Sequence, residues 1–519
     1  MKIWMIGLTL TIATFMELLD TSIANVALPH IAGGTSSSVD EATWVLTSYL
    51  VANAVVLPLS AWLSSVFGRK RYYMMSVALF TASSMLCGLA PNLGWLILFR
   101  VLQGIGGGGL APSEQAILLE VFPIAKRASA FALYSVAIVA APAVGPTLGG
   151  WITDNWSWRM CFLINIPIGL LSLWLTHRLV PNDVGTHAAG QGATQTAAAR
   201  RKAAAGSIDI VGIVLVMIAF GFIEIVLDKG QEDDWFGSSF ICASTAIGVL
   251  ALVAAVVWEL KTKNPVVALE LLRDRNFALA CAFYFTFAFV MFGSTVLMPQ
   301  MLQSLFGYSA MEAGLVLTPG ALVIMVMAPL AARLTKRIPA GYLVGVAFAV
   351  VAVALWQTSR LSLSSSYGDF VLARMLQGFG LGFLFVPVST IAYSYLPPAL
   401  NDKASSLTNL FRNEGGSFGI AAVTTLLARR SQFHQAVLAS HVRPFDPITL
   451  ETLRAFAHTH MHGPAQTLRA LSLSSVVSRQ VGFLSFLDGF RMLALFSLLV
   501  VPVTFAVRRA LSAGPQAAH

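Results

Sequence analysis

The amino-acid sequence predicts an all-α protein that crosses a membrane many times. Only 11% of its 519 residues are charged, 56% are hydrophobic, and the mean hydropathy is +0.75. Soluble domains carry about 25% charged residues, so a soluble fold of this length would expose too much apolar surface to stay dispersed. Apolar runs long enough to span a bilayer follow one another along most of the chain. Together these observations predict a polytopic membrane protein.

Each predicted element is a transmembrane helix, which needs about 20 predominantly apolar residues. In chain order, the fourteen stretches that meet this requirement are residues 5–28, 43–66, 73–90, 95–118, 129–150, 160–180, 208–228, 238–259, 276–297, 312–334, 340–358, 368–396, 404–428 and 487–508. Because the number of spans is even, both termini are expected on the same side of the membrane.

Basic residues are distributed unevenly between the two sides. With the N-terminus inside, the short outer loops hold only Arg159, Lys229 and Arg360. Other short basic groups, such as residues 69–71 and 200–202, then lie inside. The positive-inside rule therefore predicts that both termini are cytoplasmic. The net charge of +9 does not indicate a nucleic-acid partner, because these groups are separated by apolar runs and form no basic stripe.

An internal repeat divides the chain into two halves. The sequence "RVLQGIG" at residues 100–106 recurs as "RMLQGFG" at 374–380, and such repeats are typical of secondary transporters with alternating access. The predicted domains are an N-terminal six-helix bundle at 1–180, an Ala/Gly/Thr-rich cytoplasmic linker at 181–206, two extra transmembrane helices at 207–259, a cytoplasmic loop at 260–275, and a C-terminal six-helix bundle at 276–509 with a long periplasmic loop at 429–486.

Glycines are concentrated in the fourth span. The stretch "FRVLQGIGGGGLAP" places Gly104, Gly106 and Gly109 in the G-x-G-x-x-G spacing of dinucleotide-binding proteins. That motif requires a preceding strand, whereas these glycines lie inside an apolar helix and the second copy has Phe383 at the third position. Gly104 and Gly108 instead have the small-xxx-small spacing that lets membrane helices approach closely.

The fifth span repeats this pattern. Gly145 and Gly149 in "VGPTLGG" have the same spacing. Pro146 between them predicts a kink that neighbouring helices can accommodate. We expect these residues to act as joints for packing and for motion between conformations.

Ionisable residues inside spans are functional candidates, because each costs about 2.5–3.5 kcal/mol on the insertion scale. At about 1.5 Å per residue, Asp20 and Arg100 lie about 12 and 8 Å below the same membrane face, so we expect them to pair or to compete for a proton. Glu17 lies one turn deeper than Asp20 on the same helical face. Asp20, Glu17 and Arg100 are therefore candidate proton-coupling residues. The alternative is that Asp20 and Arg100 only hold helices together.

The later spans carry further charges. Glu224 is another candidate proton-coupling residue, and Asp228, one turn later, is expected at the outer interface. The alternative for this pair is an acidic outer collar. Arg374 is the repeat counterpart of Arg100, while Arg412 and Glu414 lie near the middle of the thirteenth span. We interpret Arg412 either as a receptor for an anionic substrate or as the partner of a carboxylate.

Motifs of catalysis and nucleotide binding are missing from the sequence, so neither an enzyme nor an ATP-driven pump is expected. Transport energy would then come from a proton gradient, without a cofactor. His458, His460 and His462 alternate in a polar loop, which is a pattern that usually holds no metal. We therefore expect no metal site.

Several motifs together identify a family resemblance. They are "ATFMELLDTSIANVALPHIAG", "FGRK", "FRVLQGIGGG", "VGPTLGGWI", "NWSWRMCFLINIPIG", "LDKGQEDDWF" and "SSLTNLFRNEGGSFG". The chain resembles the major facilitator superfamily over essentially its whole length, and within it the fourteen-span drug–proton antiporters of the EmrB/QacA kind. The resemblance implies the major facilitator fold and an inner-membrane pump in bacteria that exchanges protons for hydrophobic toxic compounds. It also implies a tripartite system with a periplasmic membrane-fusion adaptor and an outer-membrane channel.

The resemblance also assigns residues. Asp20 matches the acidic residue of the first-helix motif, and Arg100 matches the arginine of the fourth-helix motif. The conformational motifs are matched at Gly68, Arg69, Lys70, Gly145, Pro146, Gly149 and Gly150. The chain departs from the family pattern where Ala61 and Ser65 replace a glycine and an aspartate of the loop motif. The charge relay usual at that loop is therefore not expected in its ordinary form.

The sequence thus predicts a proton-coupled antiporter that exports hydrophobic drugs, and so a contributor to antibiotic resistance. One alternative is a proton-coupled transporter of a single physiological anion or fatty acid. An alternative of another class is a non-transporting membrane sensor or scaffold, which has no need for buried ionisable groups.

Overall fold

The computed structural model describes residues 2–181, 209–262, 265–394, 396–397, 400–441 and 465–507, and these residues form helices without a β-strand among them. The predicted linker at 181–206 lies, except for its first residue, outside the described residues. The first half contains α1 (Lys2–Thr35), α2 (Val39–Ala42), α3 (Trp44–Val56), α4 (Ser60–Phe67), α5 (Arg69–Leu89), α6 (Leu93–Gly107), α7 (Leu110–Val121), α8 (Ile124–Asn155), α9 (Met160–Leu163) and α10 (Asn165–Leu179).

The remaining helices form an inserted pair and a second half. The inserted pair is α12 (Ile210–Lys229) and α13 (Ser239–Lys261), with the short 3-10 helices η1 (Trp235–Gly237) and η2 (Leu269–Arg273) on either side of α13. The second half contains α14 (Arg275–Phe306), α15 (Ala310–Leu334), α16 (Ala340–Thr358), α17 (Tyr367–Gly382), α18 (Phe385–Tyr393), α19 (Asn401–His441) and α21 (Ala465–Thr504).

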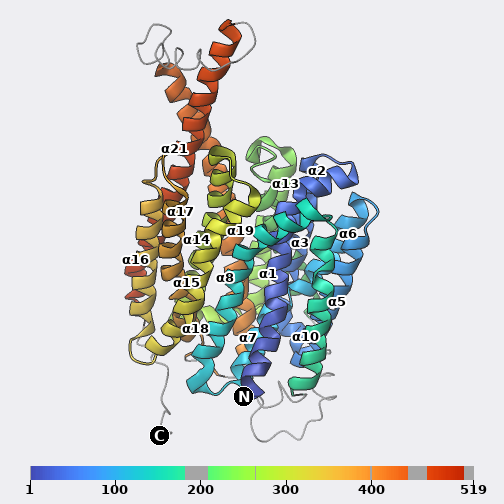
Figure 1. Cartoon of the computed structure of the whole chain (residues 1–519). Helices are drawn as coiled ribbons and strands as arrows, with labels where there is room; N and C mark the ends of the chain where they lie inside the picture. Colours follow the sequence, from blue (N-terminus) through green and yellow to red (C-terminus); the bar gives the residue numbers. More distant parts are fainter. Residues whose placement is uncertain are drawn as a thin grey trace, which may run out of the picture.

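The helices run roughly along one axis (Figure 1). Helices α3, α5, α6 and α10 lie on one side and α15, α16, α17 and α21 on the other, with α8 and α19 between them. Helix α12 packs against α13, against α3 of the first half and against α19 of the second half, so the inserted pair contacts both halves. Helix α1 begins at the lower end of Figure 1, which we call the terminal end; the other is the opposite end.

Local sequence explains where the helices begin and break. Asn92 caps α6 by accepting a hydrogen bond from the backbone N–H of Trp95 (3.1 Å). Pro58 lies in the break between α3 and α4, which meet at 62°. Gly68 joins α4 to α5 with φ of 87°, a conformation that glycine adopts without a Cβ penalty.

The predicted transmembrane spans coincide with helices of the structure. Among the described residues, eleven helices are long and apolar enough to cross a membrane, and two bent pairs, α3 with α4 and the two parts of α8, raise the number to 13. The remaining predicted span, 404–428, lies within α19, which carries Arg412 and Glu414 and is not among the apolar candidates. The count of fourteen spans therefore stays a prediction.

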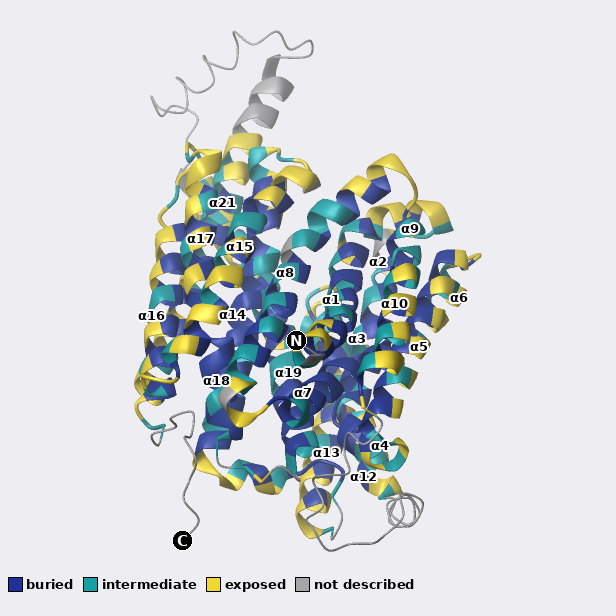
Figure 2. Ribbon diagram, turned by 60° about the horizontal axis from the view of Figure 1, so that its bottom comes forward, coloured by how far each residue is buried: buried dark blue, intermediate teal, exposed yellow. Residues whose placement is uncertain are grey.

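The outer surface carries many large apolar side chains. Figure 2 shows exposed residues along the outward faces of the helices and buried residues between them. Large apolar side chains such as Leu250 (70% exposed) and Leu499 (69%) lie on the outer surface, whereas Arg100 is fully buried. This inverted distribution is expected where lipid, not water, surrounds the protein.

One predicted boundary was wrong. The long loop expected at 429–486 is helical at both ends, because α19 continues to His441 and α21 begins at Ala465. The prediction considered only apolar length, and these helix extensions are too polar to register as spans. Residues 442–464, including the three alternating histidines, lie outside the described residues.

Candidate functional site: buried charges inside the bundle

Asp20 of α1 and Arg100 of α6 form an ion pair in the interior of the first half. Arg100 NH1 lies 2.6 Å from Asp20 Oδ2, and both side chains are completely buried. Gln103 Nε2 (3.0 Å) and Asn165 Nδ2 (2.6 Å) both donate to the other carboxylate oxygen. The expected pairing is therefore present. It draws α1, α6 and α10 together.

Tyr49 of α3 connects this pair to a second carboxylate. Its ring lies under the Arg100 guanidinium, with 4.3 Å between the guanidinium carbon and the ring centroid, a cation–π contact. Its hydroxyl lies 3.4 Å from Glu17 Oε1, to which Asn53 Nδ2 also donates (3.0 Å). Tyr49 thus contacts both Glu17 and Arg100, the partner of Asp20.

Glu114 of α7 is a functional candidate that the sequence analysis missed. It is fully buried and accepts hydrogen bonds from Thr11 (2.8 Å) and Thr14 of α1. Glu114 lies within the predicted span 95–118, so the insertion cost that singled out Glu17 applies to it equally. The sequence signal that identifies Glu114 is an acidic residue inside an apolar run.

Arg412 of α19 approaches these carboxylates from the second half. Its NH1 donates to the Tyr134 hydroxyl of α8 (3.0 Å), and its charge acts on both Glu17 and Glu114. Tyr134 in turn packs against Phe385, with ring centroids 5.3 Å apart. The two interpretations of Arg412, anion receptor and carboxylate partner, both remain open because its guanidinium is only half-buried.

Glu224 and Glu414 are brought together between the inserted pair and α19. Ser417 of α19 donates to Glu224 Oε1 (2.6 Å), and the charges of Glu224 and Glu414 act on each other. Glu224 is 1% exposed, so an acidic outer collar is the wrong interpretation for this residue. Asp228, closer to the end of α12, accepts a hydrogen bond from Thr47 of α3.

Arg374 of α17 repeats the environment of Arg100 with one difference. It donates to Gln377 (2.6 Å), as Arg100 does to Gln103, and to the hydroxyls of Ser294 (3.2 Å) and Thr295 (2.9 Å). Ser294 stands in the second half where the repeat offset places Asp20 in the first. Each half thus contains an equivalent polar network, but only the network of the first half has a carboxylate at this position.

The loop motif at the terminal end joins the two halves. Arg69 NH2 lies 2.7 Å from Asp402 Oδ2 of α19, and Arg69 also pairs with Glu120 of α7. Lys70 donates to the carbonyl oxygens of Val180 (2.6 Å) and His177 (3.1 Å), at the end of α10. The motif therefore contributes to an ion-pair cluster whose acidic members come from α7 and α19 instead of position 65.

Further hydrogen bonds cross between the halves near the same end, and all involve α18 or α19. They are Ser406 Oγ to Leu57 O (2.8 Å), Ser405 Oγ to Pro112 O (3.0 Å), Asn409 Nδ2 to Gln115 Oε1 (3.0 Å) and Tyr393 OH to Gln115 Oε1 (3.1 Å). The two halves are thus held together at the terminal end.

The glycines of the fourth and fifth spans lie at close helix contacts. A Cβ on Gly104 would lie 2.5 Å from the Tyr49 carbonyl oxygen of α3, and one on Gly108 would lie 2.7 Å from that of Asn53. Gly145 and Gly149 of α8 similarly face α1 at Ser22 and Ile23. An added Cβ at any of these four glycines would thus crowd a neighbouring helix, whereas their role as joints for motion between conformations stays a prediction. Helix α8 bends by 41° in the region of its prolines, and the role of Gly150 stays a prediction.

Comparisons with known proteins now identify the family. A family model described as Major Facilitator Superfamily matches residues 10–420. The chain belongs to this superfamily. Among major facilitator proteins it is similar to "Multidrug export protein EmrB" of Escherichia coli K12, with 38% identity over 85% of this chain and 83% of the relative. "Fatty acid resistance protein FarB" of Neisseria gonorrhoeae is 33% identical over 97% and 96%.

Solved structures of major facilitator proteins share the fold. The proton:xylose symporter XylE has a TM-score of 0.59 at 14% identity, covering 98% of each chain. The human organic anion transporter MFSD10 also has a TM-score of 0.59, at 12% identity, covering 95% of this chain and 99% of its own. The chain is thus a multi-pass membrane transporter with the major facilitator fold.

Proposed function

We propose that this chain is a proton-coupled antiporter that exports hydrophobic drugs and other toxic compounds. The observation that supports it most is the cluster of Glu17, Glu114 and Arg412, in which the charge of a guanidinium from the second half acts on two buried carboxylates of the first. Ionisable groups are costly inside a membrane and are kept there for transport. The similarity to EmrB supplies the substrate class.

The cluster suits alternating access, in which the two halves rock about a site between them. Protonation of Glu17 or Glu114 weakens its attraction to Arg412, because the neutral acid no longer offers a negative charge. Movement of α19 relative to α1 and α7 then follows the protonation state. The proton gradient is the energy source, worth about 1.4 kcal/mol per pH unit, and the membrane potential adds about 2.3 kcal/mol per charge per 100 mV. No cofactor enters this scheme.

The proposed setting is the inner membrane of a bacterium, with the terminal end of the bundle in the cytoplasm. The lysine and arginine distribution supports this orientation. At the opposite end, α19 and α21 extend beyond the neighbouring helices (Figure 1). We propose this extension as the contact for a periplasmic membrane-fusion adaptor, which would connect the transporter to an outer-membrane channel.

Proton flux in reconstituted vesicles tests the proposal. Purified protein is placed in liposomes with a pH-sensitive dye inside, and a panel of lipophilic cations, anions and neutral compounds is added. We expect several compounds to stimulate proton movement in vesicles with protein but not in empty vesicles. If no compound of the panel moves protons or is itself transported, the antiporter function is wrong and a sensor or scaffold gains support.

The similarity to FarB favours one second candidate, a transporter of a fatty acid or another physiological anion with Arg412 as its receptor. The same assay separates the two. The anion transporter would be supported instead if fatty acids, and no other compound of the panel, stimulated proton movement. This stimulation should be lost in Arg412→Gln.

A further inference from the structure

A cavity, which we call the chamber, lies between the inserted helix pair and the second half. Its volume is about 250 Å³, and its walls come from α12, α13, the segment before α14, α14 itself and α19. The surface of the chamber is apolar throughout, and Phe220, Phe285 and Phe411 are among the residues that form it. The chamber therefore offers no polar atom to a charged or hydrogen-bonding ligand.

Two acidic residues of the wall, Glu259 and Glu414, present only the hydrocarbon part of their side chains to the chamber. Both side chains are buried, and none of their oxygen atoms is exposed to the chamber. One oxygen of Glu259 instead accepts a hydrogen bond from the Val267 N–H (3.2 Å). Side chains with a polar end often cover apolar space with their stems in this way. Apolar character and shape, rather than charge, therefore select what the chamber can hold.

The chamber opens toward the lipid-facing side of the inserted pair. Among the helices that the structure describes, α13 packs closely along α12 but not along α14 or α19. Val256 of α13 lines the chamber and is 39% exposed on the outer face, where its neighbours Val253 and Leu250 are also exposed. The apolar outer face of α13 thus continues into the chamber through the opening between α13 and α14.

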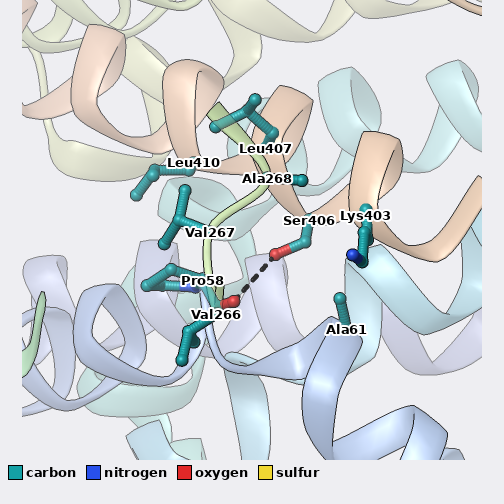
Figure 3. Close-up of a pocket in the computed structure, with 9 residues that line it drawn as sticks. All are labelled: Pro58, Ala61, Val266, Val267, Ala268, Lys403, Ser406, Leu407 and Leu410. Carbon is teal, nitrogen blue, oxygen red and sulfur yellow. Dashed lines mark hydrogen bonds between the residues drawn. The ribbon is translucent and has the colours of Figure 1, made fainter. Parts of the chain in front are cut away.

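Toward the first half the chamber is closed. Val267, Leu407 and Leu410 line both the chamber and a tighter region beside it, which has no room for a water-sized molecule (Figure 3). In this region Ser406 of α19 donates to the carbonyl oxygen of Pro58 (3.3 Å) in the first half. The route into the chamber is therefore from the lipid side.

The chamber lies at the level of the lipid tails nearer the terminal end. Phe220 and Phe285 each follow the first residue of their helix, Ile210 of α12 and Arg275 of α14, by ten positions. At about 1.5 Å per residue this places them about 15 Å along the helix, which is about half of a hydrocarbon core of about 30 Å. Apolar cavities of about 150 Å³ stay dry and bind small hydrocarbons, so the larger chamber suits a segment of a hydrocarbon chain.

We propose that the chamber binds one acyl chain of a phospholipid from the leaflet at the terminal end. The chain enters between α13 and α14 and reaches α19, the helix whose contacts join the two halves. Burial of hydrocarbon against the apolar wall provides the affinity, and lipid tails are the hydrocarbon that adjoins the opening. This binding site is independent of the proposed function, because it requires neither a transported compound nor a proton.

Photolabelling of the full chain in lipid nanodiscs tests this site. The probe is a phosphatidylcholine that carries a diazirine in the middle of one acyl chain, and the labelled peptides are identified by mass spectrometry. We expect label in residues 407–414 of α19, none of which is exposed on the outer face. Ala255→Phe fills the chamber from α13 and should reduce this label at least fivefold.

Val253→Phe is the matched control, because it adds the same ring to the outer face of the same helix and should leave the label in α19 unchanged. Both variants should keep the label on Leu499 of α21, which lies on the outer surface. Absence of label from residues 407–414 in the wild type would overturn the inference, as would equal label there in the wild type and Ala255→Phe. Label in this segment from a diazirine-bearing alkane but not from the phospholipid would also overturn it, in favour of a free hydrophobic compound.

Discussion

Arg69 of α5 and Asp402 of α19 are 333 residues apart in the sequence and form an ion pair that joins the two halves of the transporter at its terminal end. Glu120 of α7 completes the cluster. Ser65, which stands where the loop motif is expected to carry an acidic residue, donates instead to the Trp62 carbonyl oxygen (2.7 Å). The closed terminal end therefore depends on a contact between halves rather than on one within the first half.

Breaking this pair should loosen the terminal end. Asp402→Asn removes one of the two carboxylates that hold Arg69, so we expect the contact of Ser406 with Leu57 to open more often. In a background without the four native cysteines, a cysteine at position 406 should react several-fold faster with a membrane-impermeant maleimide. The matched control is Asp369→Asn, at the start of α17. Equal labelling rates in Asp402→Asn and the parent would contradict the role of the pair.

The ion pair between Arg69 and Asp402 should respond to pH. Burial raises the pKa of Asp402 above its ordinary value, while the Arg69 guanidinium opposes that rise and Glu120 adds to it. As pH falls through this raised pKa, Asp402 becomes neutral and Arg69 retains only Glu120. Labelling at position 406, divided by that of a fully accessible cysteine at the same pH to correct for the thiolate fraction, should therefore increase toward acidic pH in the parent and be nearly independent of pH in Asp402→Asn. A pH response of equal size in both would refute this assignment.

Asp20→Asn should separate proton coupling from structural pairing. Removal of one partner of a buried ion pair typically costs about 3–5 kcal/mol, although Asn165 and Gln103 remain to bond the amide. We expect a lower Tm and loss of substrate-stimulated proton flux per folded molecule. Ser294 beside Arg374 shows that this network is compatible with a neutral residue, so Asp20→Ser is a second variant to measure. If either variant exchanges protons at the normal rate per folded molecule, Asp20 has only a structural role.

Glu114→Gln should reduce substrate-stimulated proton flux at least tenfold with a small change in Tm. Glutamine can accept from one of the two threonine hydroxyls and donate its amide N–H to the other, but it carries no titratable group. Thr11→Val, which removes one of those bonds and keeps the carboxylate, is the matched control and should preserve most of the flux. Normal flux in Glu114→Gln would leave Glu17 as the carboxylate to test in this cluster.

Gly104→Val should destabilise the first half, because its Cβ would lie 2.5 Å from the Tyr49 carbonyl oxygen. Overpacking of this kind typically costs about 1–3 kcal/mol, and the displaced Tyr49 would also disturb its contacts with Arg100 and Glu17. Thermal unfolding in detergent should show a lower Tm than in Gly94→Val, where a Cβ on the same helix meets only Asn92 at 3.6 Å. Equal Tm values in the two variants would argue against a close α3–α6 contact.

The membrane class, the positions of the apolar helices and the pairing of Asp20 with Arg100 could all be predicted from the sequence. These features depend on local properties, because the length of an apolar run and the cost of a buried charge can be evaluated residue by residue. The packing of Gly104 and Gly145 could be predicted in the same way from their spacing. Glu114 was equally accessible to this reasoning and was overlooked.

The packing of the helices shows which charged groups meet. The pairing of Arg69 with Asp402 and the hydrogen bond from Arg412 to Tyr134 of the first half depend on which helices are neighbours and on the face each one presents. The helical extensions of α19 and α21 also required the structure. A helix is formed by hydrogen bonds within its own segment, whereas its partners are selected by packing against segments hundreds of residues away.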